Sequence, residues 1–262
     1  KATFKDMGLG FVYMPMYYKN QRFIPASNPV TLIADGNLIV VDPIKKKQKM
    51  LLKRKYTSKD TWKTFMNKGT FQASNDIRFR RSVNLHEVDT LDALAYHEIK
   101  IKDSKKFRYA RYLFPPKSIG NIAEMGFFSE KGEALEGKII TSKNITDSSI
   151  AQKAYDKDPL SFVNTKNRDS VEQWIGLDFG AKERISKISF CPRTDKNNVW
   201  KGLNYELFYW DDAWVSLGIK KGETYSLTYE SPVSNALYLL RCLDEGKEER
   251  IFTYENGKQI WW

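Results

Sequence analysis

The segment "WIGLDFGAKERISKISFCPRTD", residues 174–195, decides the fold expected for this chain. Apolar and polar residues alternate along it, so that Ile175 and Leu177 share one face, as in a half-buried strand. Gly180 ends this first run. A second apolar run follows and stops at Pro192, which cannot donate a hydrogen bond to a neighbouring strand. We therefore expect two strands, followed by a polar loop at one rim of the fold.

Short runs of the same kind recur along the whole chain, and helical periodicity is hard to find. Gly, Asn, Asp and Pro separate the runs, and many short strands with regular turn signals are typical of a sandwich or barrel. The sequence therefore predicts an all-β fold. The expected strands cover residues 37–42, 49–56, 97–103, 109–114, 124–129, 173–179, 185–191, 204–210, 213–218, 225–230, 236–242 and 250–255.

An internal repeat suggests how these strands are divided. "FRYARYLFPPKSIGNIAEMGFFSEKG" ends at Gly132, and "SNALYLLRCLDEGKEERIFTYENGK" reaches a matching glycine at Gly257. The offset of about 125 residues suits one sandwich domain. We expect a β segment that either ends an upstream sandwich or belongs to the first domain, a divergent first sandwich, and a second sandwich, with the respective bounds 1–44, 45–136 and 137–262.

Charge and composition restrict the classes of function. The 262 residues carry a net charge of +11, concentrated at Lys45–Lys55 and at Arg78, Arg80 and Arg81. We interpret these residues as a solvated linker and a lysine-protected strand edge; the alternative is a site for polyanions. No apolar run approaches the roughly 18 residues that a membrane span requires, so no transmembrane segment is expected. Nucleic acid is not an expected partner.

The search for catalytic groups finds no established motif. There is no Gly-x-Ser-x-Gly elbow, phosphate-binding glycine loop or His-Glu-x-x-His sequence. Cys191 would pair with His86 or His97 only if the two halves of the chain met at a site. Cys191 and Cys242 are interpreted as two buried thiols, with a disulfide in an oxidising compartment as the alternative. We expect a protein that is not an enzyme.

The ordered motifs of the second half carry a resemblance to a known family. Asp-x-Asp-Pro, Trp-Ile-x-Leu-Asp-Phe-Gly, Ile-Ser-Lys-Ile and Pro-Arg-Thr-Asp-x-Asn-Asn follow one another between residues 156 and 198. Together with "YELFYWDDAWVSLG" and "RIFTYENG", they resemble the discoidin domain, also called the coagulation factor 5/8 type C domain. The resemblance covers roughly residues 139–258, and residues 45–136 match it less well.

The resemblance implies tandem jelly-roll sandwiches of the galactose-binding superfamily. Such tandem domains occur in exported proteins of Gram-negative gut bacteria, often beside a larger enzyme or surface protein. The resemblance therefore implies a periplasmic, outer-membrane surface or extracellular location. It also implies an upstream enzyme domain as a partner within a longer protein. It also implies a structural calcium ion as the one candidate cofactor, with Asp156 and Asp158 as hard oxygen ligands.

Two loops are candidates for ligand binding. Sugars require planar hydrogen-bonding groups and an aromatic face for their C–H surface. The loop after Pro192 offers both in Arg193, Asp195, Asn197, Asn198 and Trp200. The equivalent patch in the first half is Asn75, Asp76, Arg78 and Phe79. The alternatives are that Arg193 pairs with Asp195 while Trp200 packs inward, and that the second patch is a solvated turn.

Three hypotheses follow from these patterns. The first is a non-catalytic pair of carbohydrate-binding modules that contact a glycan through rim loops; it requires Trp200 to be exposed. The second is a structural or protein-docking sandwich without a sugar site, in which Trp200 and the terminal tryptophans are packed. The third is polyanion binding through the basic patches, which would weaken steeply with added salt.

Overall fold

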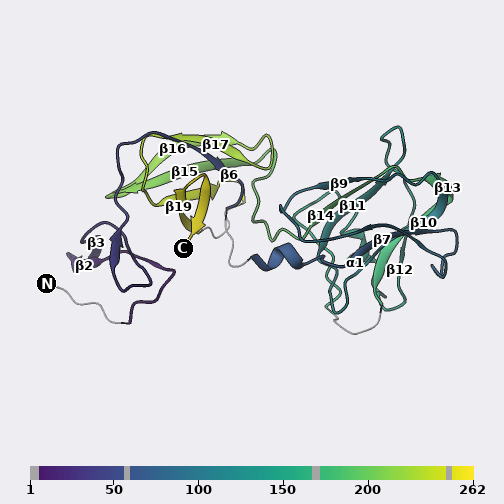
Figure 1. The fold of residues 1–262 in the computed structure, drawn as a ribbon. Coiled ribbons are helices and arrows are strands. Elements are labelled where there is room, and N and C mark those ends of the chain that lie inside the picture. The colour runs from purple at the N-terminus through teal and green to yellow at the C-terminus, as the bar shows by residue number, and fades with distance from the viewer. Residues whose placement is uncertain (1–5, 56–59, 167–171, 246–249) are drawn as a thin grey trace. The chain divides into compact units, whose positions relative to one another are not determined.

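The computed structural model describes residues 6–55, 60–166, 172–245 and 250–262 (Figure 1). Nearly all regular structure is β-strand. The described helices are the short η1 (Asp60–Thr64) and α1 (Ser148–Gln152). Each of the strand runs expected from sequence coincides with a strand, so the all-β prediction is confirmed. No helix in these ranges is long and apolar enough to cross a membrane.

The chain forms two compact units, and the second is inserted into the first. Unit 1 comprises Lys1–Ser58 and Asn197–Trp262, and unit 2 comprises Lys59–Lys196. Arg54 and Asn198 form a β-bridge, and the main-chain N–H of Lys55 donates to the carbonyl of Asn197 at 2.8 Å. The insertion therefore leaves unit 1 and returns to it at neighbouring positions.

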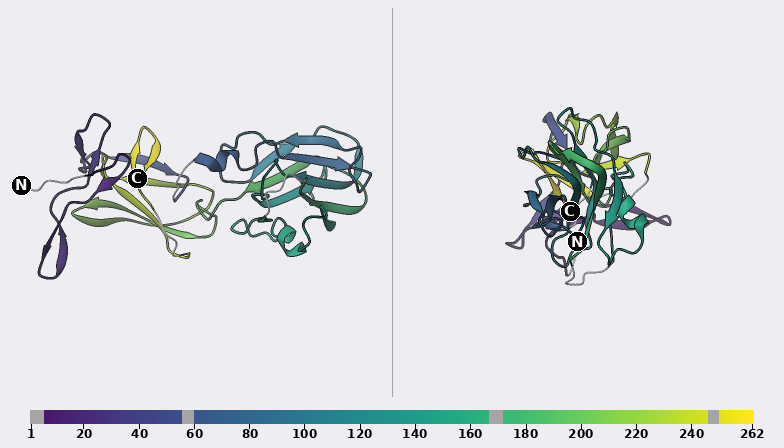
Figure 2. Two further views of the ribbon diagram at one scale, coloured as in Figure 1. Left: turned by 90° about the horizontal axis from the view of Figure 1, so that it is seen from below. Right: turned by 90° about the vertical axis from the view of Figure 1, so that its right-hand side faces the viewer.

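Unit 2 contains a five-stranded and a three-stranded sheet (Figures 1 and 2). The larger has the order β12 (Lys138–Thr141), β13 (Trp174–Arg184), β10 (Lys106–Leu113), β7 (Thr70–Ser74), β8 (Val83–Glu87). The smaller has the order β11 (Ile122–Phe128), β14 (Lys187–Pro192), β9 (His97–Lys100). All described pairs are antiparallel.

The two sheets of unit 2 share one hydrophobic core. Phe71 on β7, Tyr112 on β10 and Ile175 on β13 face Phe127 on β11 and Phe190 on β14. All five side chains are almost fully buried. Because side chains alternate across a strand, Trp174, Gly176 and Asp178 lie on the opposite, outer face of β13. The alternation expected for Ile175 and Leu177 is confirmed.

The segment 174–195 departs from expectation in one respect. β13 does not end at Gly180 but continues to Arg184, and Gly180 (φ +76°) lies at an irregularity where the register with β10 shifts. β13 and β14 then belong to different sheets. A glycine with positive φ bends a strand without ending it when a bulge absorbs the extra residues.

Unit 1 is built around a second core. Its five-stranded sheet has the order β16 (Ala213–Lys221), β15 (Asn204–Asp211), β18 (Tyr238–Cys242), β19 (Ile251–Glu255), β20 (Lys258–Trp261). The pair β17 (Leu227–Ser231) and β6 (Gln48–Leu52) supplies Tyr229, Leu227, Met50 and Leu52 to the same core as Tyr205 and Phe252. β6 comes from the N-terminal part of the chain and completes this unit.

Among the strands that the structure describes, β1 to β5 pair with one another and not with the rest of unit 1. β1 (Val12–Tyr13), β4 (Val30–Leu32) and β5 (Leu38–Val40) form one small sheet, and β2 (Met16–Lys19) and β3 (Arg22–Pro25) form a hairpin. Many large apolar side chains here are exposed, Phe23 by 71% and Tyr18 by 65%.

This division differs from the expected domains 1–44, 45–136 and 137–262. The expected boundary at 136/137 falls inside unit 2, because β12 and β13 pair into the sheet that contains β10 and β7. The expected repeat is not reproduced in pairing either: β18 pairs with β19, whereas β10 and β11 lie in different sheets. The matched glycines Gly132 (φ +80°) and Gly257 (φ +77°) both occupy turns.

Candidate functional site

The rim loop expected to bind a ligand is divided between the two units. Arg193 and Asp195 belong to unit 2, and their side chains pair with each other, with Nε and Oδ1 2.6 Å apart. The Arg193 guanidinium also lies over the ring of Phe162, 4.3 Å from its centroid. These contacts hold the loop together, as the alternative interpretation of the sequence required.

Asn197, Asn198 and Trp200 belong to unit 1. Trp200 is only 6% exposed, packs edge-on against Tyr225 at 5.3 Å, and its main-chain N–H donates to the Tyr205 hydroxyl. Asn198 is 3% exposed. The exposed Trp200 that the rim-loop hypothesis required is therefore not found, because this side chain fills space beside the unit 1 core.

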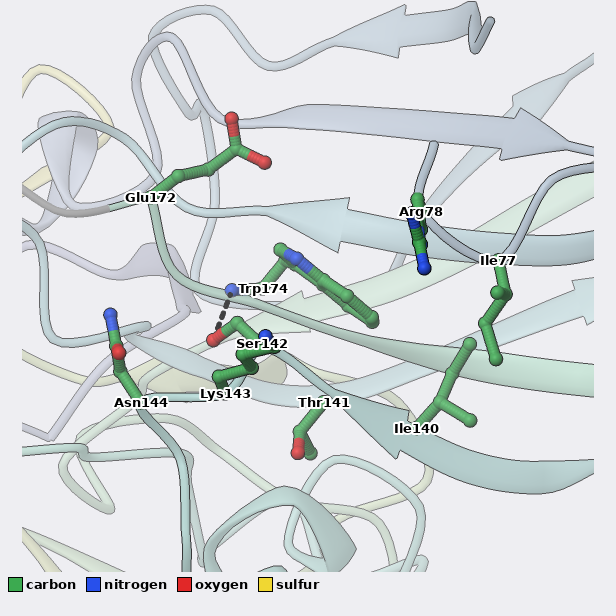
Figure 3. Close-up of a pocket in the computed structure, with 9 residues that line it drawn as sticks. All are labelled: Ile77, Arg78, Ile140, Thr141, Ser142, Lys143, Asn144, Glu172 and Trp174. Atoms are coloured by element: carbon green, nitrogen blue, oxygen red, sulfur yellow. Dashed lines mark hydrogen bonds between the residues drawn. The ribbon is translucent and has the colours of Figure 1, made fainter. Parts of the chain in front are cut away.

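A different pocket, of about 510 Å³, lies wholly within unit 2 (Figure 3). It is open to solvent and has the half-buried indole of Trp174 in its wall. Figure 3 shows the indole between the segment after β12 and the loop that follows β7. The lining residues are Ile77, Arg78, Ile140, Thr141, Ser142, Lys143, Asn144, Glu172 and Trp174.

The pocket lies on the outer face of the five-stranded sheet. Ile140, Gly176, Arg111 and Gln72 occupy opposed positions on β12, β13, β10 and β7. A Cβ at Gly176 would collide with the Ala110 carbonyl and lie 2.9 Å from the Arg111 Cα, so this approach of β13 to β10 requires glycine.

Arg111 is the buried centre of this face. Its Nε donates to Gln72 Oε1 at 2.9 Å, its guanidinium donates to Glu172 Oε1 at 2.9 Å, and the side chain is 7% exposed. The guanidinium lies 4.3 Å from the Phe79 ring centroid and 5.3 Å from that of Trp174. Burial lowers the pKa of Arg111, yet arginine keeps its charge in proteins. The indole and Glu172 are thus held by one fixed cation.

The predicted patch Asn75, Asp76, Arg78 and Phe79 forms the loop above this centre. Asn75 fixes its base, because its side chain donates to the Lys106 carbonyl and accepts from the Arg108 N–H. Asp76 accepts from the Arg78 N–H and from Arg80 Nε at 2.7 Å, and the Arg80 hydrogen bond lowers the pKa of this carboxyl.

Phe79 and Arg78 have different places in that loop. Phe79 adopts φ +54° and is 5% exposed, and its ring is tilted by 56° against that of Trp174, with the centroids 5.4 Å apart. A left-handed conformation is costly for an aromatic residue and persists only where the surroundings enforce it. Arg78 is exposed and lines the pocket. Of the four residues, one lines the pocket and the other three support it.

Sequence reasoning missed most of the pocket, including Trp174. The signal was present: if Ile175 and Leu177 face the core, Trp174 must face away from it, and an outward tryptophan beside a glycine is unusual in a solvated strand face. Glu172 stands two residues before Trp174, but Ser142, Lys143 and Asn144 come from a segment about 30 residues earlier. Only the pairing of β12 with β13 brings these three residues beside Trp174.

The predicted calcium ligands do not form a metal site by themselves. Asp156 accepts from the Asp158 N–H and from the Ser161 hydroxyl, and Asp158 accepts from the Leu160 N–H. Across the ranges that the structure describes, no three His, Cys, Asp or Glu side chains gather so that they could hold a metal ion. Asp156 instead lies beside Glu124, a carboxyl that is 6% exposed. Burial, and then Asp156, raise the pKa of Glu124 to about 8.

The basic patches are also divided. Lys45–Lys55 lies in unit 1 and Arg78–Arg81 in unit 2. Lys45, Lys46 and Lys47 are exposed, but Lys55 is buried next to Glu245, with Nζ and Oε2 3.9 Å apart. Lys55 therefore does not contribute to a surface for polyanions. Cys191 and Cys242 are buried and not bonded to each other.

Comparison of this chain with protein-family models, with curated proteins and with solved structures finds no match. The resemblance to the discoidin domain therefore stays a prediction.

Proposed function

We propose that this chain is a non-catalytic carbohydrate-binding protein and that the Trp174 pocket of unit 2, rather than the loop after Pro192, receives the glycan. The observation that carries the proposal is the partly exposed indole of Trp174, which Phe79 and Arg111 contact and hold in place. A rigid aromatic ring offers an apolar face for the C–H surface of a sugar at little entropic cost.

The groups around the indole suit the hydroxyl edge of a sugar. Asn144 supplies both a donor and an acceptor, Arg78 supplies a planar set of donors, and Glu172 supplies acceptor oxygens. These groups stand on three segments at the same pocket, so one ligand can contact all of them. Ile77 and Ile140 add apolar wall. A pocket of about 510 Å³ has the size of ordinary small-ligand sites.

The burial of Cys191, the candidate nucleophile, supports the non-catalytic part of the proposal. Burial raises the pKa of the Cys191 thiol, which keeps it protonated and unreactive at neutral pH. Export from the cytoplasm, implied by the family resemblance, is a further part of the proposal.

A glycan-array screen of the intact chain tests the proposal. We expect hits that persist in high salt, that disappear in Trp174→Ala, and that weaken in Asn144→Ala, whose exposed side chain is replaceable without disturbing the core. Trp214→Ala is the matched control, because Trp214 is 38% exposed but lies on β16 of unit 1. Hits that survive in Trp174→Ala would reject this pocket as the site.

A protein-docking role for unit 1 is the second candidate, favoured by its exposed apolar side chains. Leu9, Phe11, Tyr18, Phe23 and Ile44 are each more than half exposed, and surfaces of this kind commonly mark interaction sites. Light scattering of the intact chain beside a Tyr18→Ser, Phe23→Ser double variant tests docking between copies. Self-association of the unmodified chain alone would support it, and equal monomeric masses would contradict it.

A further inference from the structure

The charges that line the Trp174 pocket are not balanced. Arg78 comes from the loop after β7 and Lys143 from the segment after β12, and both side chains are exposed. The lining contains one carboxylate, Glu172. The buried Arg111 already binds that carboxylate at 2.9 Å. Among the described residues that line the pocket, two are cations and one is an anion, and the anion is already paired with the buried Arg111.

Asp76 interacts electrostatically with Arg78 but forms no ion pair with it. Asp76 accepts the main-chain N–H of Arg78, but its carboxylate forms its ion pair with Arg80 at 2.7 Å. Within the part of the chain that the structure describes, neither Arg78 nor Lys143 has a carboxylate within ion-pair distance. Both cations therefore keep their N–H donors for a bound molecule.

We infer that the glycan that enters this pocket is acidic, carrying a carboxylate or a sulfate ester that Arg78 and Lys143 bind. This inference rests on the proposed function and names the class of sugar. A neutral sugar would take water from two cations without offering them a counter-charge, which costs free energy. An anionic group forms charge-assisted hydrogen bonds, and arginine matches the planar geometry of a carboxylate. The net charge of +11 also attracts anionic ligands at long range.

Titration calorimetry with matched sugars tests the inference. The acidic probes are trigalacturonic acid, a hyaluronan tetrasaccharide and a chondroitin sulfate disaccharide. The neutral probes are the methyl ester of trigalacturonic acid, which has the same skeleton without charge, and galactotriose. In about 150 mM salt, which screens distant charges, we expect an acidic probe to bind about tenfold more tightly than its neutral counterpart. Whether carboxylate or sulfate probes bind best then identifies the anionic group.

Variants assign the effect to the two cations. Lys143→Gln should weaken binding of the acidic probe about fivefold or more and leave the neutral probe unchanged. Arg78→Gln should also weaken the acidic probe about fivefold or more, and by a larger factor than it weakens the neutral probe. Lys182→Gln, an exposed lysine on the distant part of β13, should change neither. Trp174→Phe should keep most of the affinity, and Trp174→Ala should lose it.

The outcomes separate this inference from the proposed function. Equal binding of acidic and neutral probes, with loss in Trp174→Ala, would overturn the inference and leave the proposed function intact. No binding of any acidic probe would also overturn it, and neutral array hits would then decide the function. Acidic probes that still bind Trp174→Ala and are released by salt would overturn it in favour of the basic patch at Lys45–Lys53.

Discussion

Arg111 illustrates how a single residue determines the surface of a sheet. It stands opposite Gly176 on one side and Gln72 on the other, and it is bound to Gln72, Glu172 and two aromatic rings. Nothing in the local sequence "FRYARYLF" distinguishes it from Arg108, three residues earlier on the same strand. Its burial arises from the loop at residues 75–80, which folds over the outer face and places Phe79 upon it.

Replacing Arg111 by Met should therefore destabilise the protein by about 2–3 kcal/mol, because the buried Gln72 oxygen loses its donor. The same change at Arg108, whose pair with Asp178 is at the surface, should cost much less. Urea unfolding of the two variants measures the difference. Equal losses would mean that Arg111 does not have the buried role described.

Glu124 should make the stability depend on pH. Its pKa is raised from 4.5 in the unfolded chain to about 8 in the folded protein. The folded state therefore binds the proton more tightly, and the contribution of Glu124 is fully present below pH 4.5 and is lost as the pH rises through 8. The slope approaches about 1.4 kcal/mol per pH unit between these values.

Glu124→Gln keeps the size of the side chain and removes this titration. We expect the variant to be as stable as the unmodified chain near pH 5 and more stable near pH 8.5, in chemical unfolding at each pH. Repeating the series with calcium and with EDTA gives the control. Parallel pH profiles for the two proteins would contradict the buried, protonated carboxyl. A calcium-dependent gain near pH 8 would instead indicate a cation at Glu124 and Asp156.

Among the secondary-structure elements, β13 shows which features of a strand the sequence predicts and which it does not. Period-two alternation in "WIGLDF" predicts the strand and its buried face correctly, and the Asp211–Ala213 turn between β15 and β16 is also found where "DDAW" predicts it. The end of β13 was predicted too early, because a glycine can mark either a strand end or a bulge. Which strands pair with each other depends on the whole fold, so the local sequence of a strand does not predict its partner.

Two glycines of β13 should respond differently to substitution by alanine. At Gly176 the added Cβ meets the backbone of Ala110 and Arg111 on β10, so we expect a loss of about 3 kcal/mol or more. At Gly180 no atom lies within 4 Å of the added Cβ, and only the positive φ is unfavourable, at about 1–2 kcal/mol. Thermal unfolding of the pair checks this order, and the reverse order would contradict the pairing of β13 with β10.

At the scale of the whole molecule, the inserted arrangement could not have been read from the sequence. The composition changes little across residues 55–60 and 190–200, and neither stretch has a run of glycine, serine or proline. The predicted rim loop at 192–200 is in fact the return crossing into unit 1, which explains why Trp200 is packed and Arg193 is paired. Among the predicted site residues only Arg78 lines the pocket, with Phe79 beneath it.

The insertion predicts that unit 2 folds without unit 1. Residues 59–196 contain a complete core with strands from both sheets. Expressed alone, this fragment should unfold in one cooperative transition. In a second protein a short Gly/Ser linker replaces unit 2 and joins Lys55 to Asn197. This protein should keep the unfolding transition of unit 1. Scanning calorimetry of both fragments measures this. A fragment 59–196 without a transition would show that the units depend on each other.

NMR can show directly whether Trp174 is the tryptophan that touches the sugar. The indole N–H resonances of the intact chain can be followed by NMR during titration with the strongest glycan from the array, and Trp174→Phe assigns the Trp174 signal. We expect the Trp174 resonance to shift in a saturable manner, while those of Trp200, Trp210 and Trp214 in unit 1 stay in place. A saturable shift confined to the unit 1 tryptophans would contradict this expectation.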